Sequence, residues 1–214
     1  MSAEYRRAEE GAPRVPLRAI DDISERMRPL VDRDRKVFGR VRNITRAVAT
    51  SPATWQATVR AEQMFVTMKR VDAATRALLC LYTSLLNGCH YCIDDAAGVA
   101  LEEGVPTGVI RSLVEPAPAL DEGTAARLAY ARFVALGEAE APEGTVAHLA
   151  RYADTEEILE VTAIVAMKCF WNRFVTALRI PPEGRCADPR LLALLFSAAE
   201  RLQGEAASHC SGRR

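Results

Sequence analysis

The sequence predicts an all-α fold, and three observations support this prediction. Apolar residues recur every three or four positions along most of the chain, whereas the strict alternation typical of a half-buried strand is nearly absent. Glycine and proline fall between the periodic segments rather than inside them. A chain of 214 residues with 49% hydrophobic content is long enough to bury one core. We therefore expect a single compact helical domain.

The first helical pattern follows a polar arm. Residues 1–16 contain two prolines and many charges, so they are expected to lie over the surface or over a neighbouring subunit. Residues 21–39 show helical spacing, and Pro29 must lie near a helix start or cause a kink. The domain itself is expected to cover residues 17–203, and residues 204–214 form a polar tail.

The following helices carry clearer start signals. Ser51 is expected to cap the helix in 51–69, with Pro52 at its first position. Asp72 caps the next one, which ends at a glycine and contains the most apolar run. The remaining segments repeat this pattern of cap and apolar periodicity: 89–104, 106–115, 121–137, 144–153, 154–178 and 188–203.

Charge and hydropathy exclude several classes of function. The 28 basic and 28 acidic side chains cancel, so nucleic acid and anionic membranes are not expected as partners. We find neither an apolar leader at the start nor a run of about 18 apolar residues, so a cytoplasmic protein is expected. The basic residues are almost all arginine, because only Lys36, Lys69 and Lys168 are lysines, which suggests a bacterial genome of high GC content.

The stretch NGCHYCIDD holds the most informative pair of side chains, Cys89 and Cys92. Positions i and i+3 share a helix face, and a helix N-terminus favours a thiolate, whereas Asp94 and Asp95 oppose it. Three interpretations remain open: a redox dithiol, a retained but idle pair, or a metal site. A metal site built on His90, Cys92 and Asp94 needs further ligands, which another subunit would have to supply. No cofactor is required by the sequence.

The neighbours of the cysteines have competing interpretations. His90 is either a base for the dithiol or a residue that faces solvent. Tyr91 is expected to pack, with a chemical role as the alternative. Asp94 and Asp95 are expected to be solvated in the first helical turn, although Asp94 is a candidate for handling a proton. The other cysteines are expected to be free thiols in a reducing compartment.

The wider pattern resembles a known family. The segments FGRVRNITRAVATSPATW, VDAATRALLCLYTSLLNGCHYCIDDAAGVALEEGV and EEILEVTAIVAMKCFWNRFVTALRIPPE cover most of the chain. They are similar to the carboxymuconolactone decarboxylase-like superfamily, in its alkylhydroperoxidase D-like, peroxidase-related branch. The resemblance implies an all-helical domain that forms dimers, trimers or hexamers. It also implies that Cys92 attacks peroxide and that Cys89 resolves the product.

The sequence departs from that family at the proton relay. The family's glutamate lies twelve residues before the first cysteine, where this chain has Ala77, and its histidine lies four residues after the second, at Ala96. Since acid–base assistance contributes roughly 10² to 10⁴ in rate, ordinary peroxidase turnover should be impaired. Alternatively, His90, Tyr91, Tyr82 or Asp94 handles the proton in a different chemistry.

Three functions follow from these residues. The first is a dithiol enzyme that reduces peroxides or disulfides with a nonstandard proton donor, and that is itself reduced by a thiol protein. The second is a non-redox biosynthetic enzyme on a small organic substrate, a cyclase, lyase or decarboxylase with or without a metal. The third is a non-catalytic oligomeric binding protein. All three are expected to be homo-oligomers.

Overall fold

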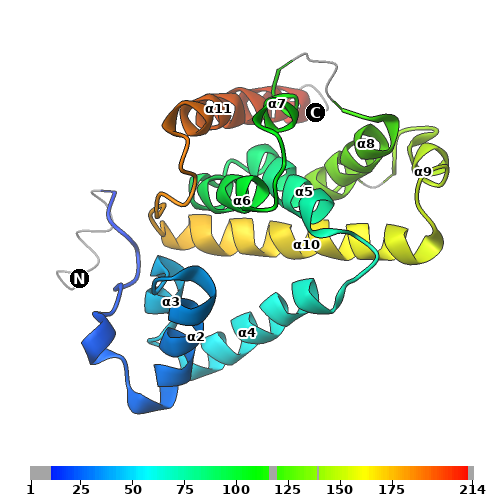
Figure 1. Cartoon of the computed structure of the whole chain (residues 1–214). Coiled ribbons are helices and arrows are strands. Elements are labelled where there is room, and N and C mark those ends of the chain that lie inside the picture. The colour runs from blue at the N-terminus through cyan, green and yellow to red at the C-terminus, as the bar shows by residue number, and fades with distance from the viewer. Residues whose placement is uncertain (1–10, 116–119, 139, 212–214) are drawn as a thin grey trace.

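The computed structural model describes residues 11–115, 120–138 and 140–211, and this part of the chain contains helices and no strand (Figure 1). The all-α prediction is therefore confirmed. Two 3₁₀ turns, η1 (Ile20–Asp22) and η2 (Glu25–Met27), precede the helices. The helices are α2 (Arg28–Phe38), α3 (Asn43–Val48), α4 (Pro52–Thr67), α5 (Ala73–Leu86), α6 (His90–Glu102), α7 (Thr107–Arg111), α8 (Glu122–Leu136), α9 (Thr145–Leu149), α10 (Thr155–Leu178) and α11 (Pro189–Ser211).

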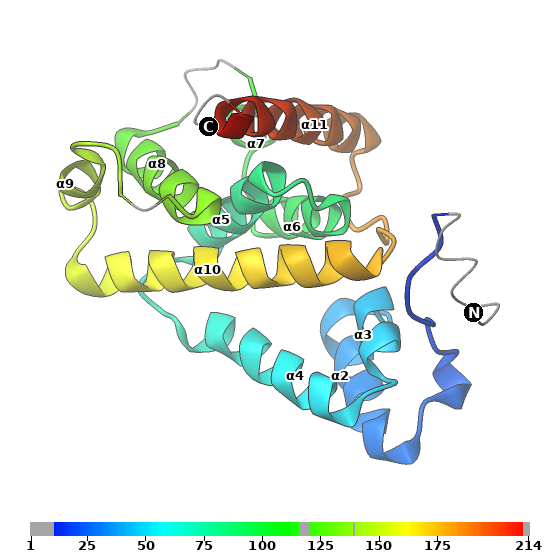
Figure 2. The same cartoon turned by 180° about the vertical axis from the view of Figure 1, so that it is seen from behind.

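Helix α10 divides the molecule into two regions. On one side lie α5, α6, α8 and α11, with the short α7 and α9, and on the other side lie α2, α3 and α4 (Figures 1 and 2). We call the first region, together with α10, the main body, and the second the N-terminal layer. The larger cluster of buried apolar side chains lies within the main body, and a smaller one joins the N-terminal layer to α6 and α10.

Helix starts follow the caps read from the sequence. The hydroxyl of Ser51 accepts a hydrogen bond from the Thr54 N–H at 3.2 Å, which satisfies one of the free N–H groups of the first turn of α4. Asp72 caps α5 in the same way. Pro29 lies in the first turn of α2 and does not kink it, because proline needs no N–H donor there.

The helices differ from the predicted segments in three places. The segment 21–39 begins with the two 3₁₀ turns, and its α-helix starts only at Arg28. The six-residue α3 forms a separate helix that the apolar spacing did not predict. Helix α11 continues to Ser211, so most of the expected polar tail extends a helix whose first half is anchored in the core.

Helix α10 is also more apolar than the sequence analysis stated. It contains an 18-residue stretch with mean hydropathy 1.2, long and apolar enough by composition to cross a membrane. Such a stretch is equally typical of a core helix, and 44% of its residues are buried inside this domain. Val161, Ile164 and Val165 are fully covered by the main body, which accounts for its apolar character.

Candidate functional site

The two cysteines lie where the turn after α5 enters α6. Gly88, with φ +63°, ends the turn, and Cys89 is the N-cap residue of α6. Cys92 follows in the first helical turn, and the two Sγ atoms are 2.6 Å apart. Both residues are at least 98% buried. The sulfurs are therefore close enough to form a disulfide without a rearrangement of the backbone.

One sulfur of this pair ionises easily. A hydrogen bond from the Cys92 thiol is the largest influence on Cys89 and lowers its pKa to about 6, although burial opposes this. The Thr176 hydroxyl and the positive charge of Lys168 lower it further. Burial, together with the adjacent Cys89, raises the pKa of Cys92. At neutral pH the reduced pair therefore carries one negative charge, held by Cys89 and shared through the hydrogen bond.

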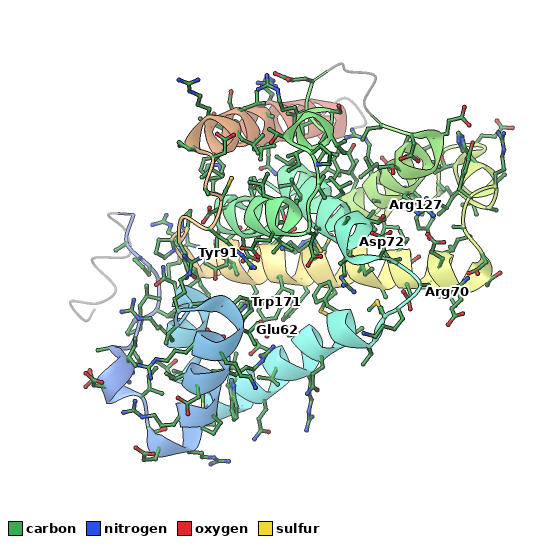
Figure 3. The ribbon with its side chains drawn as sticks, viewed as in Figure 1. Glu62, Arg70, Asp72, Tyr91, Arg127 and Trp171 are labelled. Atoms are coloured by element: carbon green, nitrogen blue, oxygen red, sulfur yellow. The ribbon has the colours of Figure 1, made fainter. Side chains whose placement is uncertain are left out.

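Cys92 lies in the wall of a cavity of about 330 Å³ between the N-terminal layer and the main body, whereas Cys89 lies behind that wall. Figure 3 shows Tyr91, Trp171 and Glu62 around this region, from α6, α10 and α4 respectively. The lining also includes Phe38, Ile44, Phe65, Val99 and Val175 as apolar groups, and Arg33, Arg42, Arg76, Lys168, Arg185, Asp95 and Glu103 as charged groups. The cavity thus combines an apolar wall with several cations.

His90 does not approach the sulfurs. Its side chain is exposed, and its ring stacks on Phe196 of α11 with the centroids 4.5 Å apart. The structure therefore favours the second of the two interpretations, in which His90 points away from the dithiol. A role as the proton acceptor for Cys92 finds no support in this geometry.

Tyr91 and Asp94 both hold the loop that precedes α11. The Tyr91 hydroxyl donates to Glu183 Oε1 at 2.7 Å, and burial, with Asp95 and Glu183, raises its pKa. Asp94 is 99% buried, rather than solvated as expected, and accepts four backbone N–H groups from residues 183–186 at 2.7–3.2 Å. Its oxygens are occupied by these bonds, so we assign Asp94 to positioning this loop.

The same loop packs closely on α6 through Gly98. A Cβ atom on Gly98 would lie 2.5 Å from Arg185 Cγ and 2.9 Å from its carbonyl carbon, so only glycine allows this approach. Arg185 in turn pairs with Asp95 at 2.8 Å and with Glu102 at 2.6 Å. These contacts close one end of the cavity.

The metal interpretation finds no ligand set here. His90, Cys92 and Asp94 point to α11, to the cavity and to the loop respectively. Across residues 11–115, 120–138 and 140–211, no three His, Cys, Asp or Glu side chains are arranged to hold an ion. The donors named from the sequence are therefore not brought together within the chain.

Neither a family model nor a curated protein matches the sequence, but solved structures match the fold. An uncharacterized peroxidase-related protein from a Silicibacter species has a TM-score of 0.71 at 18% identity, over 80% of this chain and 92% of that one. A putative antioxidant defence protein AhpD from Agrobacterium tumefaciens gives 0.59 at 24% identity, over 64% and 94%. This chain has the alkylhydroperoxidase D-like fold.

A third structure with this fold contains a ligand. The debrominase Bmp8, in a variant with a cysteine replaced by alanine and in complex with 2,3,4-tribromopyrrole, has a TM-score of 0.69 at 19% identity. The match covers 88% of this chain and 96% of that one. The fold expected from the resemblance is thus confirmed, and proteins that share it include an enzyme and a putative antioxidant protein.

The two alanines that replace the expected relay line the cavity beside Cys92. Ala77 is on α5 and Ala96 is on α6, and both are at least 97% buried. Cys80, one helical turn after Ala77, also lines the cavity, and burial raises the pKa of its thiol. The two positions at which the resemblance places the relay therefore face the cavity and carry no acid or base.

Lys168 is the cavity residue that the sequence analysis missed. It is on α10 and is 92% buried, and no hydrogen bond or ion pair joins its ammonium group to another residue in the described ranges. Although burial opposes its charge, the nearby Cys92, Cys80 and Asp95 raise its pKa, so it stays protonated. Its signal in the sequence was a single lysine inside a long apolar helix of an arginine-rich chain.

Proposed function

We propose that this chain is a dithiol oxidoreductase that reduces a small electrophilic substrate held in the cavity. The observation that carries the proposal is the position of the pair: Cys92 faces the cavity, and Cys89 lies behind it with the sulfurs 2.6 Å apart. Of the two cysteines, only Cys92 can thus attack a substrate in the cavity. Cys89 is then the thiol placed to attack the adduct on Cys92 and form the disulfide. This matches the roles that the family resemblance implies.

The low pKa of Cys89 supplies a base inside the pair. As Cys92 attacks an electrophile X–Y, its proton passes to the Cys89 thiolate, Y leaves with the electron pair of the X–Y bond, and Cys92–S–X forms. Cys89 then attacks the Cys92 sulfur, which releases X with the proton and leaves a Cys89–Cys92 disulfide. The substrate gains two electrons, and a second dithiol, on a reductant protein, must return them by thiol–disulfide exchange.

This internal base accounts for the missing relay. The proton acceptor lies 2.6 Å from the attacking sulfur, so neither a glutamate at position 77 nor a histidine at position 96 is needed for the first step. The absence of a strong acid for the leaving group favours substrates whose leaving group is stable as an anion. Two proteins that share this fold, a debrominase and a putative antioxidant protein, support electrophilic substrates of this kind.

The test is a single-turnover assay on the reduced protein without oxygen. With an excess of an aryl disulfide or a hydroperoxide, wild type should lose two thiols per chain and form the 89–92 disulfide. Cys92→Ser should show no reaction at this site. Cys89→Ser should form one adduct on Cys92 more slowly, because the internal base is absent, and should stop there, because nothing resolves the adduct.

Cys80→Ser is the matched control, since it removes another thiol from the same cavity and should leave the reaction unchanged. If Cys89→Ser and Cys92→Ser both retain full activity on the native substrate, the pair is inherited packing. The non-redox biosynthetic enzyme then becomes the better explanation.

A further inference from the structure

The charged groups of the cavity are unevenly paired. Arg42 is neutralised by Asp34 at 3.0 Å and Glu62 at 2.9 Å, and Glu62 also holds Arg33. Arg185 pairs with Asp95 and Glu102. The remaining two cations, Lys168 and Arg76, have no acidic partner in the part of the chain that the structure describes, and Arg76 donates only to the carbonyls of Phe65 and Met68.

Lys168 has three N–H donors, and none of the residues that the structure describes accepts a hydrogen bond from them. A buried ammonium group costs several kcal/mol unless it is paired or hydrogen-bonded, so an open donor set at a cavity wall points to a ligand. Asp95 is near enough to act through its charge, but its carboxylate is already bonded to Arg185. Of the other two acids of the lining, Glu62 is paired with Arg33 and Arg42, and Glu103 is exposed at the rim.

The dithiol offsets only part of the positive charge of Lys168 and Arg76. In the reduced protein the pair supplies one negative charge, and in the disulfide it supplies none. Arg185 faces two carboxylates and leaves one net negative charge there, so Lys168 and Arg76 are balanced in the reduced state and leave one positive charge in the disulfide state. The N–H donors of Lys168 stay open in both states. An anion from outside the chain is the group that completes the site.

The walls determine what kind of anion fits. Phe38, Ile44, Phe65, Val99 and Trp171 line the same cavity of about 330 Å³, so the body of the ligand must be apolar. A fully hydrated inorganic ion would leave these surfaces uncovered. The cavity is large enough for a small ring with one substituent.

We propose that the cavity binds a small organic anion, with its negative group on Lys168 and its apolar body against Phe65 and Trp171. Bound there, the anion lies in the same cavity as Cys92. The claim that this anion is the substrate rests on the proposed function. The claim that the cavity binds an anion does not. The two can therefore be tested separately.

The binding test uses the Cys89→Ser/Cys92→Ser double variant, which cannot carry out the redox reaction. Benzoate and its neutral analogue benzamide are titrated by calorimetry in a buffer of low chloride content. Benzoate should bind at least tenfold more tightly than benzamide. The proposal would be overturned if benzoate bound no more tightly than benzamide, if benzoate did not bind, or if chloride bound as tightly as benzoate.

A second comparison assigns the site to Lys168. Lys168→Met in the double-serine background should weaken benzoate binding at least tenfold, while Lys69→Met, the same change at an exposed lysine, should leave it unchanged. An unchanged affinity in Lys168→Met excludes Lys168 as the anchor. If Lys168→Met does not fold, as judged by circular dichroism, the benzoate–benzamide comparison with Lys168 intact still decides the proposal.

The substrate claim has its own measurement. The dithiol form of the wild type should react faster with a carboxylated aryl disulfide, dithiobis-nitrobenzoate, than with neutral dithiodipyridine. Lys168→Met should lower the ratio of these two rates at least tenfold. If benzoate binds but Lys168→Met leaves the preference intact, the anion is a ligand and not the substrate. If benzoate does not bind but the dithiol still turns over, the anion site is wrong and the proposed function stands.

Discussion

The main body and the N-terminal layer are held together in different ways. In the main body, large side chains such as Leu81, Leu85 and Leu195 are fully buried. In the N-terminal layer, α4 buries only Thr58 among its described side chains, and a carboxylate, Asp34, is completely buried against Arg42. Apolar burial stabilises without directional bonds, whereas buried ion pairs stabilise only with their partners in place.

The cavity lies where the two regions meet. Apolar side chains join the regions there, because Ile44 and Val48 of α3 belong to the same buried cluster as Val175 of α10. Polar contacts lie along the same boundary, such as the hydrogen bonds that Glu183 accepts from the Tyr91 hydroxyl and from the Asn43 N–H. A space of about 330 Å³ remains between these contacts, and Cys92 lies in its wall.

The largest effect is expected from Asp94→Ala, which frees the loop whose Glu183 bonds to the N-terminal layer. Four backbone N–H groups of residues 183–186 lose their acceptor, and at about 1–3 kcal/mol for each unsatisfied group, partly recovered by water, the free energy of unfolding should fall by about 4 kcal/mol. Urea unfolding measures this change. Asp32→Ala, at an exposed position, serves as control, and an equal loss in both variants would contradict our assignment of Asp94.

The second prediction contrasts one residue from each region. Arg42→Met leaves the buried Asp34 unpaired and should cost about 3 kcal/mol. Leu195→Ala should cost a similar amount, about 2–5 kcal/mol, by leaving a cavity in the main body. Hydrogen exchange separates them: Arg42→Met should accelerate exchange in residues 28–67 only, and Leu195→Ala throughout the main body. Uniform acceleration in both would remove the distinction between the regions.

The third prediction adds the missing relay to the cavity wall. Ala77→Glu with Ala96→His places an acid and a base beside Cys92, and should raise the rate of hydroperoxide reduction by roughly 10². Initial rates at equal concentrations of folded protein measure this. Ala73→Glu, at another lining position, is the control for adding charge alone. The gain is expected from protonation of the leaving group, and a double variant no faster than wild type would show that this protonation does not limit the rate.

The fourth prediction concerns pH and the reduced dithiol. Folding lowers the pKa of Cys89 from an ordinary value of 9.0 to about 6. The contribution of the Cys89 thiolate to the stability of the folded protein is therefore complete above pH 9, and it is lost as the pH falls through 6. Between pH 6 and 8 the unfolded chain holds the proton and the folded chain does not. The stability of the reduced protein, relative to Cys89→Ser, should therefore rise by about 2 kcal/mol over this interval. Urea unfolding at both pH values measures it, and a parallel pH dependence in the two proteins would contradict the low pKa.

The smallest effect on folding is expected from the N-terminal arm. Arg14 donates from its backbone N–H to the Leu178 carbonyl at 2.9 Å and from its side chain to Ala177 at 2.7 Å. Deleting residues 1–16 should cost about 1 kcal/mol of folding free energy. We predict a homo-oligomer, to which the exposed Leu159 and Phe170 of α10 contribute, and the deletion should weaken assembly more than folding. Light scattering that gives a single 23.4 kDa species for the intact chain would contradict this prediction.

The sequence by itself determined the helices and the dithiol. Ser51 and Asp72 cap the helices that follow them, because a cap bonds an N–H only three residues away. Cys89 and Cys92 are close for the same reason, since three residues at a helix start fix their separation. The fold class followed from the apolar periodicity that these helices share. Each of these features depends on interactions within about four residues.

Only the tertiary structure decided what surrounds the dithiol. Asp94 was expected in solvent but bonds a loop about 90 residues away, and His90 turns to α11 instead of to the sulfurs. Lys168 faces the cavity because α10 packs across both α5 and α6. Neither spacing nor composition encodes such contacts, since they depend on which helix faces meet once the core is packed. The sequence therefore specified the reactive pair through local bonds, and the packing of distant helices set its partners.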